Sequence, residues 1–139
     1  MKTLRMFLEE SNYVYLYHGT HKDNVKSFMK NGLMANDSRT NEKRGVAWLS
    51  QRADVAFAYA VMGGETNYVQ SKKPKDVPDK DRALIVFKIP RKWFDDNVLR
   101  IKNGSIPEVS FNKGIPAKFV DDIIIGNRQK VYSFPETKI

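Results

Sequence analysis

The chain has 139 residues, the length of one folded domain, and 41% of them are hydrophobic, as in globular proteins. It contains no cysteine, which excludes a disulfide framework, thiolate metal ligands and a cysteine nucleophile. With His18 and His21 as its two imidazoles, a histidine-rich metal centre is also disfavoured. The net charge of +8 favours association with polyanions, meaning nucleic acid or an acidic protein surface.

Neither a membrane span nor a secretory signal is expected. No segment approaches the roughly 18 consecutive apolar residues of a membrane-spanning helix. Glu9 and Glu10 stand where a secretory signal would have its apolar run. We therefore expect a cytoplasmic protein with no membrane partner, and a monomer is the expected oligomeric state.

The first half of the chain combines short helical and strand patterns. Residues 1–10 have the apolar spacing of a short amphipathic helix. Residues 13–20 are dense in aromatic and β-branched side chains and predict a strand, and a helix to about Lys30 follows. The apolar stripe of this helix is expected to comprise Val25, Phe28 and Met29. The remaining expected elements of this half are a polar loop over 35–44, a strand over 45–50, a helix over 53–62 and a second loop over 65–82.

The second half is strand-like. Residues 83–90 form a nearly continuous apolar run, as expected for a strand that is buried on both faces. Shorter candidate strands follow at 98–101, 108–111, 121–126 and 130–134. Helices early and strands late predict a single α+β domain over residues 11–139, whose sheets pack on one another and on the helices.

The segment Tyr17-His18-Gly19-Thr20 stands at the C-terminal end of the first predicted strand. A histidine followed by glycine lets a ligand approach bare backbone while the imidazole reaches beside it. A histidine packed at a strand end, with no ligand, is the alternative interpretation of so short a string. His21, three residues further on, is expected at the surface where the helix begins.

Further short motifs follow in a characteristic order. They are Asn31-Gly32-Leu33, Gly45-Val46-Ala47-Trp48-Leu49-Ser50, Ala56-Phe57-Ala58-Tyr59-Ala60, Pro107-Glu108-Val109-Ser110-Phe111 and Gly114-Ile115-Pro116, ahead of Ile123-Ile124-Ile125. From Tyr15 to Ile125 this order resembles the ADP-ribosyltransferases of the histidine–tyrosine–glutamate branch, the group that includes diphtheria toxin and the poly-ADP-ribose polymerases. The resemblance implies an ADP-ribosyltransferase-like split β-sandwich with flanking helices, and NAD as the substrate.

The family's NAD-binding residues have matching positions in this chain. The resemblance implies that His18 hydrogen-bonds a ribose hydroxyl and that the backbone of Gly19 holds the nicotinamide carboxamide, with Thr20 completing this part of the site. Trp48 stands where the family usually has the tyrosine that walls the nicotinamide pocket, so the middle residue of the family triad departs from the pattern. Tyr59 matches the tyrosine that stacks on the nicotinamide ring.

The catalytic glutamate of the family opens a late strand, a position that Glu108 matches, and Ser50 lies where a hydroxyl could support that glutamate or the carboxamide. Cleavage of the nicotinamide–ribose bond creates an oxocarbenium-like cation, so a neighbouring carboxylate stabilises the transition state more than the ground state. Stacking of the cationic nicotinamide on Tyr59 and Trp48 would contribute on the order of 1–2 kcal/mol. This chemistry requires no metal, and no metal is expected.

Each of these residues also has an ordinary structural explanation. Core packing explains Tyr59 and Trp48, a solvated strand entrance explains Glu108, and an N-cap of the 53–62 helix explains Ser50. Other carboxylates compete for the role of the acid but match the order of the motifs less well: Glu65, Asp95 and Asp96.

The acceptor of ADP-ribose is expected to be a macromolecule, either a host protein or nucleic acid. Arginine-specific members of the superfamily carry a second acid two residues before the catalytic glutamate, where this chain has Ile106. Arginine is therefore disfavoured as the acceptor. Basic loops at Arg39–Arg44 and Lys72–Lys80 could contact a phosphate backbone, although solvation of exposed loops explains the same charges.

Residues 1–10 resemble the capsid-targeting peptides of internal proteins packaged by large tailed phages. Those peptides are removed after an aliphatic residue, any residue and glutamate, a pattern that Leu8-Glu9-Glu10 satisfies. This resemblance implies delivery from a phage head into the host cytoplasm. Two other functions stay open: an RNA 2′-phosphotransferase-like enzyme, and a small basic nucleic-acid-binding or phage structural protein without catalysis.

Overall fold

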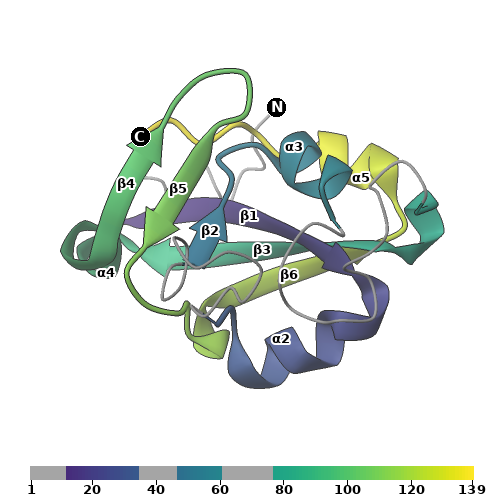
Figure 1. Ribbon diagram of the computed structural model, residues 1–139, viewed down its shortest axis with the longest axis horizontal. Helices are drawn as coiled ribbons and strands as arrows, with labels where there is room; N and C mark the ends of the chain where they lie inside the picture. The colour runs from purple at the N-terminus through teal and green to yellow at the C-terminus, as the bar shows by residue number, and fades with distance from the viewer. Residues whose placement is uncertain (1–11, 35–46, 61–76) are drawn as a thin grey trace, which may run out of the picture.

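The computed structural model describes residues 12–34, 47–60 and 77–139, so the expected helix at 1–10 and the polar loop at 35–44 lie outside it. The α+β class is confirmed, because the described residues form two antiparallel three-stranded sheets and four α-helices (Figure 1). The strands are β1 (Tyr13–His21), β2 (Ala47–Leu49), β3 (Arg82–Pro90), β4 (Val98–Lys102), β5 (Glu108–Phe111) and β6 (Val120–Ile125). The helices are α2 (Val25–Asn31), α3 (Ala53–Ala58), α4 (Arg91–Asn97) and α5 (Arg128–Tyr132).

The first sheet has the strand order β1-β3-β6, with β3 in the centre. β1 pairs with β3 along its whole length, from Tyr13 opposite Pro90 to His21 opposite Arg82. The side chains of β3 are buried on both faces of this sheet, as the continuous apolar run predicts. This central strand explains why the core has two parts, one on each side of the sheet.

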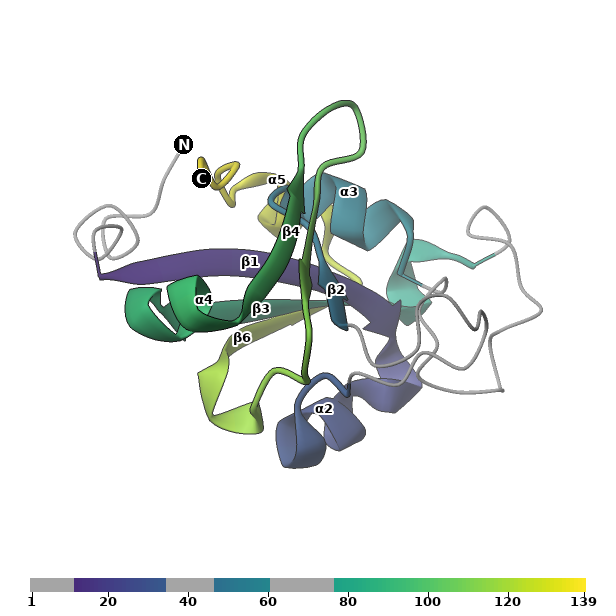
Figure 2. The same ribbon diagram turned by 60° about the vertical axis from the view of Figure 1, so that its left-hand side comes forward.

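The second sheet has the order β2-β5-β4 and packs on one face of the first (Figure 2). Leu49 and Val109 from the second sheet share a core with Leu16 and Phe87 from the first. The alternation of side chains along a strand then places Trp48, between Ala47 and Leu49, on the opposite face of the second sheet.

The other face of the first sheet is covered by α3 and α5. Ala56 and Phe57 of α3 and Val131 of α5 pack there on Tyr15 and Tyr17 of β1. α2 and α4 belong to the other side of the sheet, where each contributes one buried phenylalanine, Phe28 and Phe94 respectively, to the core shared by the two sheets.

The expected strand at 130–134 is wrong, because α5 occupies this segment. Gly126 ends β6 with a φ of 66°, and the Asn127 side chain accepts a hydrogen bond from the Lys130 amide, a helix N-cap. Val131 is buried while Tyr132 is 57% exposed, so only one face of the segment contacts the core. The apolar residues that indicate a strand are equally compatible with one amphipathic helical turn.

Three smaller expectations also need correction. The segment 91–97, to which the sequence pattern assigns no element, is the helix α4, with Pro90 immediately before its first residue. Met29 is 63% exposed and does not belong to the apolar stripe of α2, which buries Phe28. His21 is buried rather than at the surface, and its Nδ1 accepts a hydrogen bond from the Asp23 amide.

Candidate functional site

The C-terminal half of β1 and the end of β2 lie side by side. The backbone of Tyr17 exchanges two hydrogen bonds with Ser50, at N–O distances of 2.9 Å and 2.8 Å. These bonds use the edge of β1 that faces away from β3. Tyr17 and Val86 form a non-hydrogen-bonded pair of the antiparallel ladder, so the amide and carbonyl of Tyr17 point away from β3. The bridge brings His18, on β1, next to β2.

His18 contacts β2 directly. Its Nδ1 lies 3.1 Å from the carbonyl oxygen of Trp48, and its ring centroid lies 5.3 Å from that of Phe28. Because a carbonyl oxygen only accepts hydrogen bonds, Nδ1 is the donor in this contact, as in the tautomer that carries its single proton on Nδ1. Nε2 is then the acceptor nitrogen, the chemistry required to bind a ribose hydroxyl.

Gly19 presents backbone at the same outer edge of β1. It follows Tyr17 by two residues, so its amide and carbonyl point away from β3 like those of Tyr17. In the described part of the chain, no hydrogen bond is assigned to either group, although Gly19 is buried. The outward N–H and C=O of Gly19 lie side by side at this edge, a pattern that suits a ligand with one acceptor and one donor. A carboxamide is such a ligand.

The helix α3 packs against Gly19 without any intervening side chain. A Cβ atom placed on Gly19 would lie 1.8 Å from the carbonyl oxygen of Ala56 and 2.9 Å from the Cα of Ala60. Tyr59 is the C-cap of α3 and immediately precedes Ala60, so this packing brings Tyr59 to the C-terminal end of β1. The Tyr59 side chain is 41% exposed, which argues against the alternative that it is a core residue.

Thr20 lies differently. Its side chain is fully buried, and its hydroxyl accepts a hydrogen bond of 3.0 Å from the Asn24 side chain. This bond ties the end of β1 to the turn that leads into α2. The Thr20 hydroxyl therefore has its hydrogen-bond partner within the fold, in the segment that leads into α2.

Ser50 joins β1, β2 and the start of β5. Its hydroxyl donates to the carbonyl oxygen of Pro107 at 2.9 Å and accepts from the Arg52 amide at 3.0 Å. The N-cap of α3 is Arg52 rather than Ser50, so the expected capping explanation does not hold. Ser50 instead fastens the residue before Glu108 to the strand that contacts His18.

Glu108 is the first residue of β5, and its side chain is half-buried. The register pairs Trp48 with Ser110 and Leu49 with Val109, so the next position along β2, Ser50, lies opposite Glu108. Leu49 and Val109 face the core, and Glu108 therefore faces the same outer side as Trp48. The early histidine and the late glutamate thus belong to two segments that flank β2.

The competing carboxylates do not join this arrangement. Asp95 and Asp96 are exposed on α4, where Asp96 forms an ion pair of 3.1 Å with Lys92. Glu65 lies outside the described residues. Of the candidates for the acid that lie within the described residues, Glu108 is the one that the structure places beside β2.

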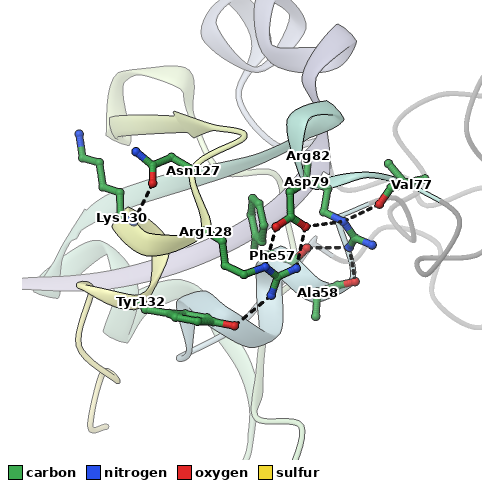
Figure 3. Close-up of polar contacts among 9 residues, drawn as sticks. All are labelled: Phe57, Ala58, Val77, Asp79, Arg82, Asn127, Arg128, Lys130 and Tyr132. Carbon is green, nitrogen blue, oxygen red and sulfur yellow. Dashed lines mark hydrogen bonds and ion pairs between the residues drawn. The ribbon is translucent and has the colours of Figure 1, made fainter.

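A polar cluster at the C-terminal end of α3 was not predicted from the sequence (Figure 3). Arg82 is 5% exposed, and its guanidinium donates to the carbonyl oxygens of Phe57 and Ala58 at 3.0 Å and 2.6 Å. Burial lowers the pKa of Arg82 from its ordinary value. The one local signal in the sequence is Arg82 itself, which directly precedes the apolar run 83–90 but falls within the loop expected over 65–82.

The same cluster contains an exposed ion pair. Arg128 donates to both carboxylate oxygens of Asp79, at 2.6 Å and 2.7 Å, and stacks over the ring of Phe57. These hydrogen bonds from Arg128 lower the pKa of Asp79 below its ordinary value. Asp79 in turn lies 3.9 Å from the guanidinium of Arg82.

Within residues 12–34, 47–60 and 77–139, no group of three or more histidine, aspartate and glutamate side chains is arranged to hold a metal ion. No helix in these residues is long and apolar enough to cross a membrane. A comparison with known protein families and with curated proteins finds no match to this sequence.

Proposed function

We propose that this protein is an NAD-dependent mono-ADP-ribosyltransferase that transfers ADP-ribose to a macromolecular acceptor, on an ADP-ribosyltransferase-like split β-sandwich. The observation that carries the proposal is the position of β2 between His18 and the strand that begins with Glu108. Two segments that lie far apart in the sequence, and that match the two ends of the family motif, thereby flank one short strand.

The groups around β2 suit the parts of NAD. The outward amide and carbonyl of Gly19 match the acceptor and donor of a carboxamide, and the acceptor nitrogen of His18 matches a ribose hydroxyl. Tyr59 supplies an exposed aromatic side chain from the end of α3 that packs on Gly19, and Trp48 supplies a second one from β2. Tryptophan offers a larger ring face than tyrosine to a cationic nicotinamide, so the departure at position 48 is compatible with binding.

In the proposed reaction the bond between nicotinamide and ribose breaks, and its electron pair leaves with nicotinamide. The acceptor forms a new bond to the same ribose carbon and loses a proton to solvent. Glu108 accepts a hydrogen bond from the ribose 2′-hydroxyl and stabilises the positive charge that develops on the sugar. Ser50 holds the start of β5 through Pro107, which orients Glu108 without contacting the substrate.

Two cations on β4 favour an anionic acceptor. Arg100 lies opposite Ser110, and Lys102 lies opposite Glu108, so both share the outer face with Glu108. Both side chains are exposed. A phosphate backbone that approaches Glu108 across this face would meet two positive charges, and we therefore favour nucleic acid over protein as the acceptor.

The test is incubation of the purified protein with NAD labelled in its adenylate part and a bacterial lysate. Released nicotinamide is measured, and labelled macromolecules are treated in parallel with protease and nuclease. We expect nicotinamide release by the wild type, loss of release in Glu108→Gln, and wild-type release in the matched control Asp95→Asn, which removes an exposed carboxylate on α4. Nuclease-sensitive label identifies nucleic acid as the acceptor, and protease-sensitive label identifies protein.

Equal release by the wild type and Glu108→Gln, or no release and no NAD binding by the wild type, would refute the proposed activity. The second result, combined with salt-dependent binding to nucleic acid, would support the basic binding protein without catalysis instead.

A further inference from the structure

We infer that Arg82 is a positioning residue for NAD binding: from β3 it fixes the C-terminal end of α3, and through it the orientation of Tyr59 relative to Gly19. This inference rests on the proposed function and concerns a residue that never contacts the substrate. Three observations support it: the hydrogen bonds of Arg82, the packing of α3 on Gly19, and the exposure of Tyr59.

The C-terminal end of α3 carries carbonyl groups that a longer helix would satisfy internally. α3 spans the six residues Ala53–Ala58, so its last carbonyls need partners from outside the helix. The Arg82 guanidinium, buried beneath them, donates to Phe57 at 3.0 Å and to Ala58 at 2.6 Å (Figure 3). A cation is also the favourable charge at this end of a helix dipole.

Arg82 is itself fixed in place. It is the first residue of β3 and pairs with His21, two residues beyond Gly19 on the neighbouring strand. Its Nε donates to the carbonyl oxygen of Val77 at 3.0 Å, which leaves the rest of the planar guanidinium aimed at α3. The guanidinium therefore connects the end of α3 to the sheet that presents Gly19.

Tyr59 is held on both sides by these contacts. Arg82 binds the carbonyl of Ala58, the residue before Tyr59. The backbone of Ala60, the residue after it, lies so close to Gly19 that no Cβ fits between them. Tyr59, which is 41% exposed, thus has its backbone held at both neighbours, at the end of α3 that packs on Gly19. Ring stacking requires such a fixed orientation, because the attraction depends on the geometry of the two rings.

Loss of Arg82 should therefore weaken NAD binding more than it slows cleavage. Uniform loss of binding raises KM while kcat is retained, whereas a smaller folded fraction lowers apparent kcat and leaves KM unchanged. This difference separates positioning from a purely structural role. Displacement of Tyr59 forfeits the stacking, and we expect an increase in KM of about tenfold.

The experiment compares Arg82→Lys and Arg82→Met with the matched control Arg128→Met. Arg128 belongs to the same cluster and binds Asp79, but it makes no hydrogen bond to the carbonyls of α3. KM and kcat for NAD cleavage are measured for each variant, together with amide hydrogen exchange at residues 57–60. Lysine keeps the charge without the planar fork, so Arg82→Lys should lie between the wild type and Arg82→Met.

We expect raised KM and faster exchange at residues 57–60 in both Arg82 variants, and wild-type KM in Arg128→Met. If Arg82→Met fails to fold, Arg82→Lys carries the comparison. A wild-type KM in Arg82→Lys would overturn the inference while the proposed function stands. Equal increases in KM in Arg82→Lys and Arg128→Met would also overturn it, because the effect would then belong to the whole cluster. A wild type that neither binds nor cleaves NAD would overturn the proposed function and this inference together.

Discussion

Gly19 offers a direct test of how the site is built. Its φ is not positive, so an alanine would not be strained by the backbone conformation of β1 itself. The cost of Gly19→Ala comes instead from α3, because the new Cβ would lie 1.8 Å from the carbonyl oxygen and 2.7 Å from the carbonyl carbon of Ala56. Both atoms are backbone, so no side-chain rotation relieves the clash.

The size of the effect follows from this geometry. The backbone of α3 must withdraw by more than about 1 Å to restore an acceptable contact. Overpacking of this kind lowers the free energy of unfolding by about 1–3 kcal/mol. The lower conformational entropy of the unfolded alanine variant offsets about 0.4–1 kcal/mol of this loss. We expect a net loss of about 1–2 kcal/mol, which corresponds to a decrease in Tm of about 3–8 °C for a chain of this length.

Denaturant unfolding and thermal unfolding measure the loss of stability, and titration with NAD measures the effect on binding. Displacement of α3 moves Tyr59 away from Gly19, so NAD affinity should fall as well. The double variant Gly19→Ala/Ala56→Gly should be no more stable than Gly19→Ala, because the clashing atoms belong to the backbone of Ala56. Unchanged stability in Gly19→Ala, or recovery of stability in the double variant, would show that the description of this contact is incorrect.

Three further predictions concern the reaction, the acceptor and the dependence of stability on pH. Glu108→Gln should lower kcat for nicotinamide release by roughly 10²–10³-fold, while the Kd for NAD, measured by calorimetry, should stay within about twofold of the wild-type value. A large change in Kd would indicate that Glu108 contributes to NAD binding instead. Arg100→Glu should weaken binding to single-stranded nucleic acid and reduce the salt dependence of this binding by about one phosphate contact, with nicotinamide release unchanged. An unaltered salt dependence in filter-binding assays would show that the acceptor binds elsewhere on the protein. The hydroxyl of Tyr17 is buried and donates to the carbonyl oxygen of Pro135 at 2.8 Å, and burial raises its pKa well above the ordinary value of 10.0. The stability that this group contributes is therefore present below pH 10 and is lost as the pH rises from 10 through the raised pKa. Tyr17→Phe should lower the free energy of unfolding by about 1 kcal/mol at neutral pH. In denaturant titrations above pH 10, this variant should lose stability less steeply than the wild type. Parallel stability curves for the two proteins above pH 10 would contradict this assignment.

Much of the fold could be predicted from local patterns. The continuous apolar run at 83–90 predicts a strand buried on both faces, and β3 occupies the centre of the first sheet. The aromatic and β-branched segment at 13–20 predicts β1, which ends one residue later at His21. Such elements are predictable because burial on a given face imposes a periodicity that the side chains themselves record.

The segments at 91–97 and 130–134 show where local patterns fail. Both are helices of five to seven residues, too short for a helical period to be distinguished from a strand or a loop. In α5 the decision depends on Asn127, whose side chain caps the helix, and on the single buried residue Val131. The apolar residues of 130–134 are evident in the sequence. The helical conformation depends on the burial of Val131 beside α3, which the sequence does not show.

The sequence alone determined the long strands β1 and β3, the α+β class and the order of the residues proposed to bind NAD, because these properties depend on composition and spacing along the chain. Only the tertiary structure decided that Ser50 bridges Tyr17 and Pro107, that the backbone of α3 rests on Gly19, and that Arg82 holds the last carbonyls of α3. Each of these contacts joins residues that are distant in sequence and uses backbone atoms that every residue type possesses. No pattern of side chains records such contacts, so they become visible only when the packed chain brings the backbones together.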